Sequence, residues 1–228
     1  MPKAKQTEKR LWARVKNKLG DEQTLMGKHW SFNLYDDPKR LAFVLSRYKF
    51  AAKMISRREC ILELGCSEGI GAPVLSEFAL SYLGVDLDGN AIDAAKHNLA
   101  SDKLKFILDD FLGKKYGKFD AVVSLDVVEH IVAENEQLFF DAFNNNLAED
   151  GIGIIGTPNA VAKSHASPTS ERGHVNLFDM DRLRKEMQKI FHNVFVFGMN
   201  DEIVHTGFSP MAHYILAVGC NKKNRVKT

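Results

Sequence analysis

Residues 61–71 have the sequence Ile-Leu-Glu-Leu-Gly-Cys-Ser-Glu-Gly-Ile-Gly, which is the strongest indication of the fold class in this chain. An apolar run leads to the acidic Glu63, and three glycines follow at Gly65, Gly69 and Gly71. Such a pattern is typical of a buried parallel strand that turns sharply into a helix around a ligand. Because glycine has no Cβ, its backbone can approach a ligand closely. The stretch therefore predicts an α/β fold with a ligand-binding turn.

The spacing of the three glycines differs from that of a dinucleotide-binding turn. That turn has the pattern Gly-x-Gly-x-x-Gly, which cradles a pyrophosphate on a helix N-terminus. Here Ser67 and Ile70 occupy the places of the second and third glycines. Glu63, just before the turn, would repel a pyrophosphate but suits a cationic ligand. We therefore expect this turn to bind something other than NAD.

Strand and helix patterns alternate along the rest of the chain. Strands are expected at 60–65, 81–86, 104–109, 119–125 and 151–156, and helices near 70–79, 89–99, 130–147 and 179–190. Two last apolar segments, 193–199 and 211–219, have no helix between them, which favours an antiparallel pair. The expected architecture is a Rossmann-like, doubly wound α/β sheet of seven strands with the last strand antiparallel.

The N-terminal part precedes this alternation and is expected to form a helical cap. Apolar residues line one side of an amphipathic helix over 8–19, and Pro38 opens a second helix that runs to about residue 55. We divide the chain into an N-terminal extension and lid (1–57), a catalytic domain (58–220) and a basic tail (221–228).

Composition and charge limit the class of protein. The 228 residues are 45% hydrophobic and 26% charged, which is ordinary for a globular domain, and no apolar run approaches the roughly 20 residues of a membrane span. The three cysteines form no metal-spaced pair, so we expect no metal site and a reducing, cytoplasmic setting. Residues 1–18 carry seven Lys or Arg and one acidic residue, which we interpret as a solvated basic end or a contact with RNA or an acidic surface.

Acidic residues follow consecutive strands of the expected sheet. Asp86 ends the second strand, Asp110 follows the third, and Asp126 follows the fourth. A single acidic residue after a strand often serves simply as the N-cap of the next helix. Several acidic residues at the same edge of a sheet instead indicate a bound ligand. A carboxylate at the second position can bind a ribose diol.

Together these motifs resemble class I S-adenosylmethionine-dependent methyltransferases, and in particular the small-molecule branch that includes ubiquinone-pathway and sugar O-methyltransferases. The resemblance covers about residues 58–220 and rests on Glu63-x-Gly65-x-x-x-Gly69-x-Gly71, Gly84-Val85-Asp86, Asp110-Phe111 and Asp126-Val127-Val128-Glu129-His130. It implies S-adenosyl-L-methionine as the cofactor. The cofactor-binding residues that it implies are Glu63, Gly65, Cys66, Gly69, Gly71, Asp86, Leu87, Asp110, Phe111 and Leu125.

Candidate catalytic residues are those that could remove a proton from an acceptor at the same sheet edge. We expect Asp126 and His174 to have this role, and we interpret His130 as a structural residue at the start of a helix. Residues expected to contact the acceptor come from the N-terminal cap and from the segment after the fifth strand: Trp30, Thr157, Asn159 and Arg172.

The acceptor is expected to be small and polar, with an oxygen of a sugar, a sugar nucleotide or a related cell-surface precursor as the methylated atom. Nucleobase amine methyltransferases carry an Asn/Asp-Pro-Pro-aromatic motif after the fourth strand, where this chain has Leu125-Asp126-Val127-Val128. Nucleic acid is therefore not the expected acceptor, and we expect a monomer or homodimer without a membrane span. Three alternatives stay open: an RNA or protein methyltransferase, a non-catalytic cofactor-binding scaffold, and an NAD-dependent oxidoreductase.

Overall fold

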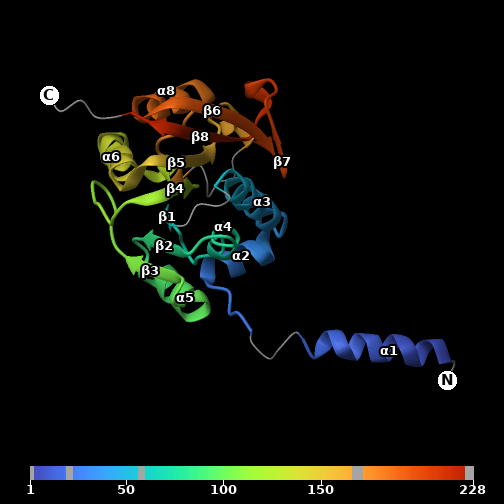
Figure 1. Cartoon of the computed structure of the whole chain (residues 1–228). Helices are drawn as coiled ribbons and strands as arrows, with labels where there is room; N and C mark the ends of the chain where they lie inside the picture. Colours follow the sequence, from blue (N-terminus) through green and yellow to red (C-terminus); the bar gives the residue numbers. More distant parts are fainter. Residues whose placement is uncertain (1–2, 19–22, 56–59, 166–171, 224–228) are drawn as a thin grey trace.

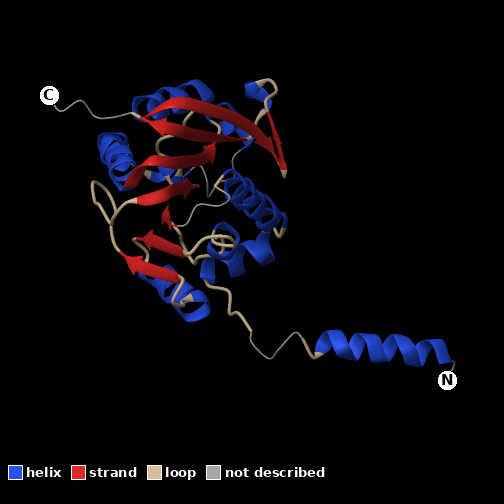
Figure 2. Ribbon diagram, viewed as in Figure 1, coloured by secondary structure: helices blue, strands red, loops and turns tan. Residues whose placement is uncertain are grey.

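A computed structural model describes residues 3–18, 23–55, 60–165 and 172–223. They form one eight-stranded sheet with the strand order β3-β2-β1-β4-β5-β8-β6-β7 (Figure 1). Helices cover both faces of the sheet (Figure 2). The expected doubly wound α/β class is therefore confirmed.

The first five strands form the parallel half of the sheet. They are β1 (Cys60–Leu64), β2 (Ser81–Asp86), β3 (Leu104–Leu108), β4 (Phe119–Leu125) and β5 (Leu147–Pro158). β1 pairs with β2 on one side and with β4 on the other, so the strand order reverses between β1 and β4. Ligands of such sheets bind beyond the carboxyl ends of the strands at this switch point.

The C-terminal half contains one strand more than expected. β8 (Tyr214–Lys222) lies between β5 and β6 (Phe191–Asn200) and is antiparallel to both. The short β7 (Ile203–His205) pairs antiparallel with the end of β6 and forms the sheet edge. The expected count of seven strands was therefore low by one, because three residues are too few for an alternating apolar pattern.

In the described part of the chain, four helices pack on the sheet after β1. They are α4 (Ala72–Leu75), α5 (Gly89–Leu99), α6 (Glu136–Asn146) and α8 (Met180–Ile190), with 3-10 turns η1 (Val128–His130), η2 (Ala133–Asn135), η3 (Ala160–His165) and η4 (Ser209–Met211). α5 begins where the side chain of Asp88 accepts a hydrogen bond from Asn90 N at 2.9 Å. The helix expected over 130–147 starts only at residue 136, because Ile131 and Val132 have extended backbones between the two 3-10 turns.

The two faces of the sheet have separate cores because side chains of a strand alternate between them. In β1, Ile61 packs on the face covered by α3 (Lys39–Met54), α4 and α5, whereas Leu62 and Leu64 pack on the face covered by α6 and α8. All three side chains are buried. The central strand is thus held on both sides, which fixes the turn that follows it.

The described residues of the N-terminal part form three helices. α1 (Lys3–Lys16) extends away from the sheet (Figure 1), and its apolar Leu11, Trp12 and Val15 are exposed. α2 (Lys28–Asp36) falls in a polar stretch where no helix was expected, and α3 follows it. The boundary expected at 57/58 and residues 224–228 of the tail lie outside the described residues. None of the described helices is long and apolar enough to cross a membrane.

Candidate active site

The turn after β1 is tied to the end of β2 by hydrogen bonds. Gly65 N donates to Val85 O at 2.8 Å, and Ser67 N donates to Asp86 Oδ2 at 2.7 Å. Gly65, Ser67 and Gly69 all have positive φ angles, of 81°, 48° and 73°. These left-handed residues fold the chain back at the switch point. Asp86 is therefore oriented by the turn beside it.

The glycines of the turn also make room for protein side chains. A Cβ at Gly65 would lie 2.2 Å from Val127, and a Cβ at Gly71 would lie 1.9 Å from the ring of Tyr48 on α3. Gly71 thus serves the packing of α3 against α4. Cys66 is buried in the same core, and burial raises the pKa of its thiol, which keeps the thiol neutral.

Glu63 lies beneath the turn and has no exposed surface. Tyr48 Oη donates to its Oε1 at 2.7 Å, and Tyr82 Oη donates to its Oε2. Burial raises the pKa of Glu63 to about 7, although the two tyrosine hydrogen bonds oppose this shift. Both carboxylate oxygens of Glu63 accept hydrogen bonds from buried tyrosines. Glu63 therefore supports the turn through Tyr48 and Tyr82.

The residues expected around the nucleoside lie at the ends of β2 and β3. Asp86 is half-buried, and its Oδ1 accepts a hydrogen bond from Asp88 N at 2.9 Å. Leu87 and Asp110 are exposed. Phe111 instead is buried and packs on Phe139, with a ring-centroid distance of 6.2 Å. Phe111 therefore supports the end of β3 from the core.

The end of β4 carries an ion pair. Leu125 is buried, and the next residue, Asp126, has a positive φ of 58°. Arg47 Nη1 of α3 donates to both oxygens of Asp126, at 2.7 and 2.9 Å. The same guanidinium lies over the ring of Tyr214, 3.8 Å from its centroid. The expected base Asp126 is thus held by a cation.

Glu129 is a second buried carboxylate, one turn further along the chain. Its Oε2 accepts a hydrogen bond from Thr157 Oγ1 at 2.9 Å, whereas its Oε1 is buried without a hydrogen-bond partner in the described part of the chain. Burial, followed by the charge of Asp126, raises the pKa of Glu129 to about 8. Its carbonyl accepts hydrogen bonds from Val175 N and Asn176 N, which attach the 173–176 segment to η1.

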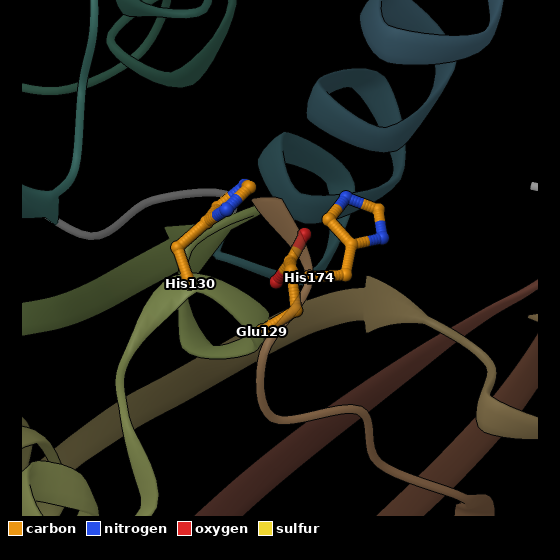
Figure 3. Close-up of side chains that lie close together, drawn as sticks. All are labelled: Glu129, His130 and His174. Carbon is orange, nitrogen blue, oxygen red and sulfur yellow. The ribbon is translucent and has the colours of Figure 1, made fainter. Parts of the chain in front are cut away.

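Two histidines lie beside Glu129. The rings of His130 and His174 are 5.1 Å apart at an angle of 70°, and Figure 3 shows the Glu129 carboxylate between them. His130 Nδ1 is 2.9 Å from Gly173 O. Burial, with the charge of His130, lowers the pKa of His174, which favours its neutral imidazole. The structure thus brings together His130 and His174, which the sequence analysis treated separately.

The four residues expected to contact the acceptor are differently placed. Thr157 is buried against Glu129, and the buried Asn159 donates through Nδ2 to two carbonyls of the 209–212 segment. Trp30 is buried, and its Nε1 has no partner among the described residues. Arg172 is exposed next to Gly173. Direct contact with an acceptor remains a prediction for all four.

Sequence analysis missed several residues that shape this site. Glu68 accepts hydrogen bonds from His29 N at 2.8 Å and from Trp30 N at 3.1 Å, so its carboxylate caps α2. Arg47 and Tyr214 were not assigned to the site either. No local sequence signal marks these contacts, since the partners are distant in the chain.

Comparison with known families identifies one matching family model, described as a methyltransferase domain, over residues 35–190. A ubiquinone biosynthesis O-methyltransferase of Glaesserella parasuis is 26% identical over 140 residues, which are 57% of this chain and 56% of the relative. A ribosomal protein L11 methyltransferase of Thermotoga neapolitana is 29% identical over 125 residues, which are 52% of this chain and 46% of the relative. The chain thus spans about half the length of these curated relatives.

A similar fold occurs in the N-methyltransferase NodS from Bradyrhizobium japonicum in complex with S-adenosylhomocysteine. The two structures superpose with a TM-score of 0.62 at 16% identity, over 83% of this chain and 91% of NodS. At this identity the similarity concerns the fold.

Proposed function

Because the chain belongs to the methyltransferase domain family, in its class I S-adenosylmethionine-dependent form, we propose that it methylates an oxygen of a small polar acceptor. The acceptor class that we propose is a sugar, a sugar nucleotide or a related cell-surface precursor. The observation that supports the proposal is the row of acids at the carboxyl edge of the sheet, beside the turn after β1.

The residues at this edge fit a cationic nucleoside. Asp86 is oriented by Ser67 N and Asp88 N, each bound to a different oxygen, and each oxygen keeps a second lone pair for a ribose hydroxyl. Asp110 is exposed at the next strand end, where its carboxylate can accept a hydrogen bond from an exocyclic amine. A pyrophosphate would be repelled by the same carboxylates.

When bound, S-adenosylmethionine supplies a methyl group on a positively charged sulfonium. The chain's own residues then have to align the acceptor and remove its proton. In this proposal Gly65, Cys66 and Gly69 surround the methionine part, and Leu87 covers the adenine. Leu125 and Asp126 provide an apolar wall and a negative charge near the reacting end.

His174 is the better placed of the two expected bases. Asp126 is held by Arg47 through both oxygens, so it is less available to accept a proton. His174 is half-buried, and its lowered pKa keeps the imidazole neutral near pH 7. We therefore propose that His174 acts on the acceptor oxygen and that Asp126 has an electrostatic role.

RNA or protein methylation is a second candidate, because α1 is basic and exposes an apolar side. Deleting residues 1–18 and 224–228 tests it. The C-terminal cut must spare residue 222, since Lys222 Nζ donates to Asn144 O and Leu147 O. Unchanged turnover of a small acceptor after both deletions would argue against RNA or protein as the acceptor.

The proposal is tested by calorimetry with S-adenosylhomocysteine and NADH, followed by methyl transfer from labelled S-adenosylmethionine to a panel of hydroxylated metabolites. We expect binding of S-adenosylhomocysteine, no binding of NADH, and label on an oxygen of one acceptor class. Tight NADH binding would support the oxidoreductase instead. Cofactor binding without transfer to any acceptor would support the scaffold.

A further inference from the structure

We propose that Glu129, His130 and His174 form a binding site for a divalent transition-metal cation. Each residue offers one ligand atom, and these atoms lie within 4.8 Å of one another. Ligand atoms around a four-coordinate zinc ion are about 3.3 Å apart, since each metal–ligand bond is about 2.0–2.1 Å long. Figure 3 shows that the three side chains approach a common point from two separate segments.

The unpartnered oxygen of Glu129 is the second observation that points to a cation. The side chain has no exposed surface, and Oε1 has no hydrogen-bond partner among the described residues. Oε2 is bound by Thr157 Oγ1, which orients the carboxylate so that it points between the two imidazole rings (Figure 3). A buried carboxyl oxygen without a hydrogen-bond partner is costly, and a cation that takes the place of the carboxyl proton would satisfy it.

The surroundings of His130 prepare it as a ligand. A carbonyl oxygen can only accept, so the 2.9 Å contact with Gly173 O requires the proton on Nδ1. The lone pair of Nε2 is then free for a metal. Metal-binding histidines usually donate their other ring nitrogen to a carbonyl or carboxylate in this way, which fixes the ring.

The position of His174 is fixed by the backbone. Val175 N and Asn176 N donate to Glu129 O at 2.9 and 3.0 Å, so the segment that carries His174 is attached to the residue that carries the carboxylate. Two imidazoles and one carboxylate favour Zn²⁺, Mn²⁺ or Fe²⁺, whereas Mg²⁺ and Ca²⁺ prefer oxygen ligands alone. Three protein ligands also leave coordination positions open for water or an acceptor oxygen.

The expectation of no metal site rested on the cysteines, and the present site contains none. A role of this metal site in catalysis rests on the proposed methyl transfer, whereas the binding of a cation does not depend on it. A hydroxyl bound to the cation loses its proton to water more readily. Its oxygen then forms the bond to the methyl carbon, and the carbon–sulfur bond breaks with its electron pair going to sulfur. His174 would then act through the cation instead of removing the proton itself.

The test is a titration of the chelator-treated full chain with Zn²⁺, with Mn²⁺ and Mg²⁺ compared. We expect one Zn²⁺ per chain, and a loss of affinity of about 100-fold or more in His174→Ala and Glu129→Gln, since even outer-shell changes cost 10–100-fold. His192→Ala, on an exposed residue of β6, is the matched control and should bind Zn²⁺ as the wild type does. With Co²⁺ as probe, the visible absorption bands of the bound ion should weaken or shift in His130→Ala, which removes one of the two imidazole ligands.

S-adenosylhomocysteine binding serves as the folding control for each variant and separates this inference from the proposed function. Stoichiometric Zn²⁺ binding without methyl transfer would support the metal site and contradict the proposed methyltransferase activity. Methyl transfer without Zn²⁺ binding would support the proposed function and contradict the metal site. Equal Zn²⁺ affinity in the wild type and the folded ligand variants, or tighter Mg²⁺ than Zn²⁺ binding, would overturn the metal site.

Discussion

Arg47 and Asp126 join α3 to the end of β4 through a single guanidinium nitrogen, which lies 2.7 and 2.9 Å from the two carboxylate oxygens. The side chains are 18% and 33% exposed, so the pair is partly shielded from water. Asp126 also has a left-handed backbone, which an ion pair can hold in place. Arg47 therefore neutralises an acid that would otherwise stand unpaired near the buried Glu129.

Replacing Arg47 by Met should destabilise the protein. Asp126 would lose its partner, and we expect the free energy of unfolding to fall by about 2 kcal/mol, below the range for fully buried pairs because this pair is partly exposed. In the Arg47→Met/Asp126→Asn double variant the loss should be less than additive by about 1 kcal/mol. Urea unfolding measures all three variants.

Arg40→Met is the control for this ion pair. Arg40 is more exposed and only approaches Asp36 and Asp37, at 3.8 and 3.7 Å. Its replacement should change stability by less than about 0.5 kcal/mol. The Arg47–Asp126 pair would contribute little to stability if Arg40→Met and Arg47→Met lowered the free energy of unfolding equally. The same would follow if the effects of Arg47→Met and Asp126→Asn were strictly additive.

Glu63 should make stability depend on pH. Its folded-state pKa of about 7 lies above the usual value of 4.5, so the folded protein binds the proton more tightly than the unfolded chain. The stabilisation that this proton contributes to the free energy of unfolding is fully present below pH 4.5. It declines as the pH rises through 7 and is absent above that, a change of about 3 kcal/mol.

Glu63→Gln removes this titration and keeps the size of the side chain. We expect the variant to gain stability relative to the wild type by about 3 kcal/mol between pH 4 and pH 8, as measured by urea unfolding at each pH. Taking the difference between the two proteins cancels the other titrating groups, including Glu129. A difference that is constant with pH would show that Glu63 has no raised pKa.

Much of the sheet followed from the sequence because buried parallel strands have apolar runs and end in turn residues. β2, with Asp86 at its end, was expected at its observed bounds. α2 was not expected, since its cap is supplied by Glu68, 39 residues away from His29 in the chain. Tertiary contacts of this kind leave no periodic signal.

The candidate site shows the same limit. Each of Asp126, Glu129 and His174 stands in a recognisable segment, but the ion pair of Asp126 depends on Arg47, 79 residues earlier. The hydrogen bond that orients Glu129 comes from Thr157, on another strand. Sequence motifs therefore located the carboxyl edge, whereas the pairing of its side chains depends on the packing of α3, β4 and β5.

Gly71→Ala should disturb the contact between the turn and α3. The new Cβ would lie 1.9 Å from the ring of Tyr48, so either the ring or the turn must move. We expect a loss of about 2 kcal/mol, as is typical of overpacking. Gly89→Ala, whose Cβ would lie 3.6 Å from Leu108, should change stability little. Thermal unfolding compares the two, and equal melting temperatures would mean that Tyr48 moves aside freely.

Asp86→Asn should weaken cofactor binding without unfolding the protein. An asparagine keeps one acceptor oxygen for either Ser67 N or Asp88 N but loses the charge, so hydrogen bonds to a ribose diol become weaker. We expect the dissociation constant of S-adenosylhomocysteine to rise about 10-fold or more, since charged hydrogen bonds contribute about 1.5–3 kcal/mol. Asp93→Asn makes the same change at an exposed residue of α5 and should leave binding unaltered. Calorimetry decides the matter: if both variants bind as the wild type does, Asp86 serves the turn alone and the ribose is held elsewhere.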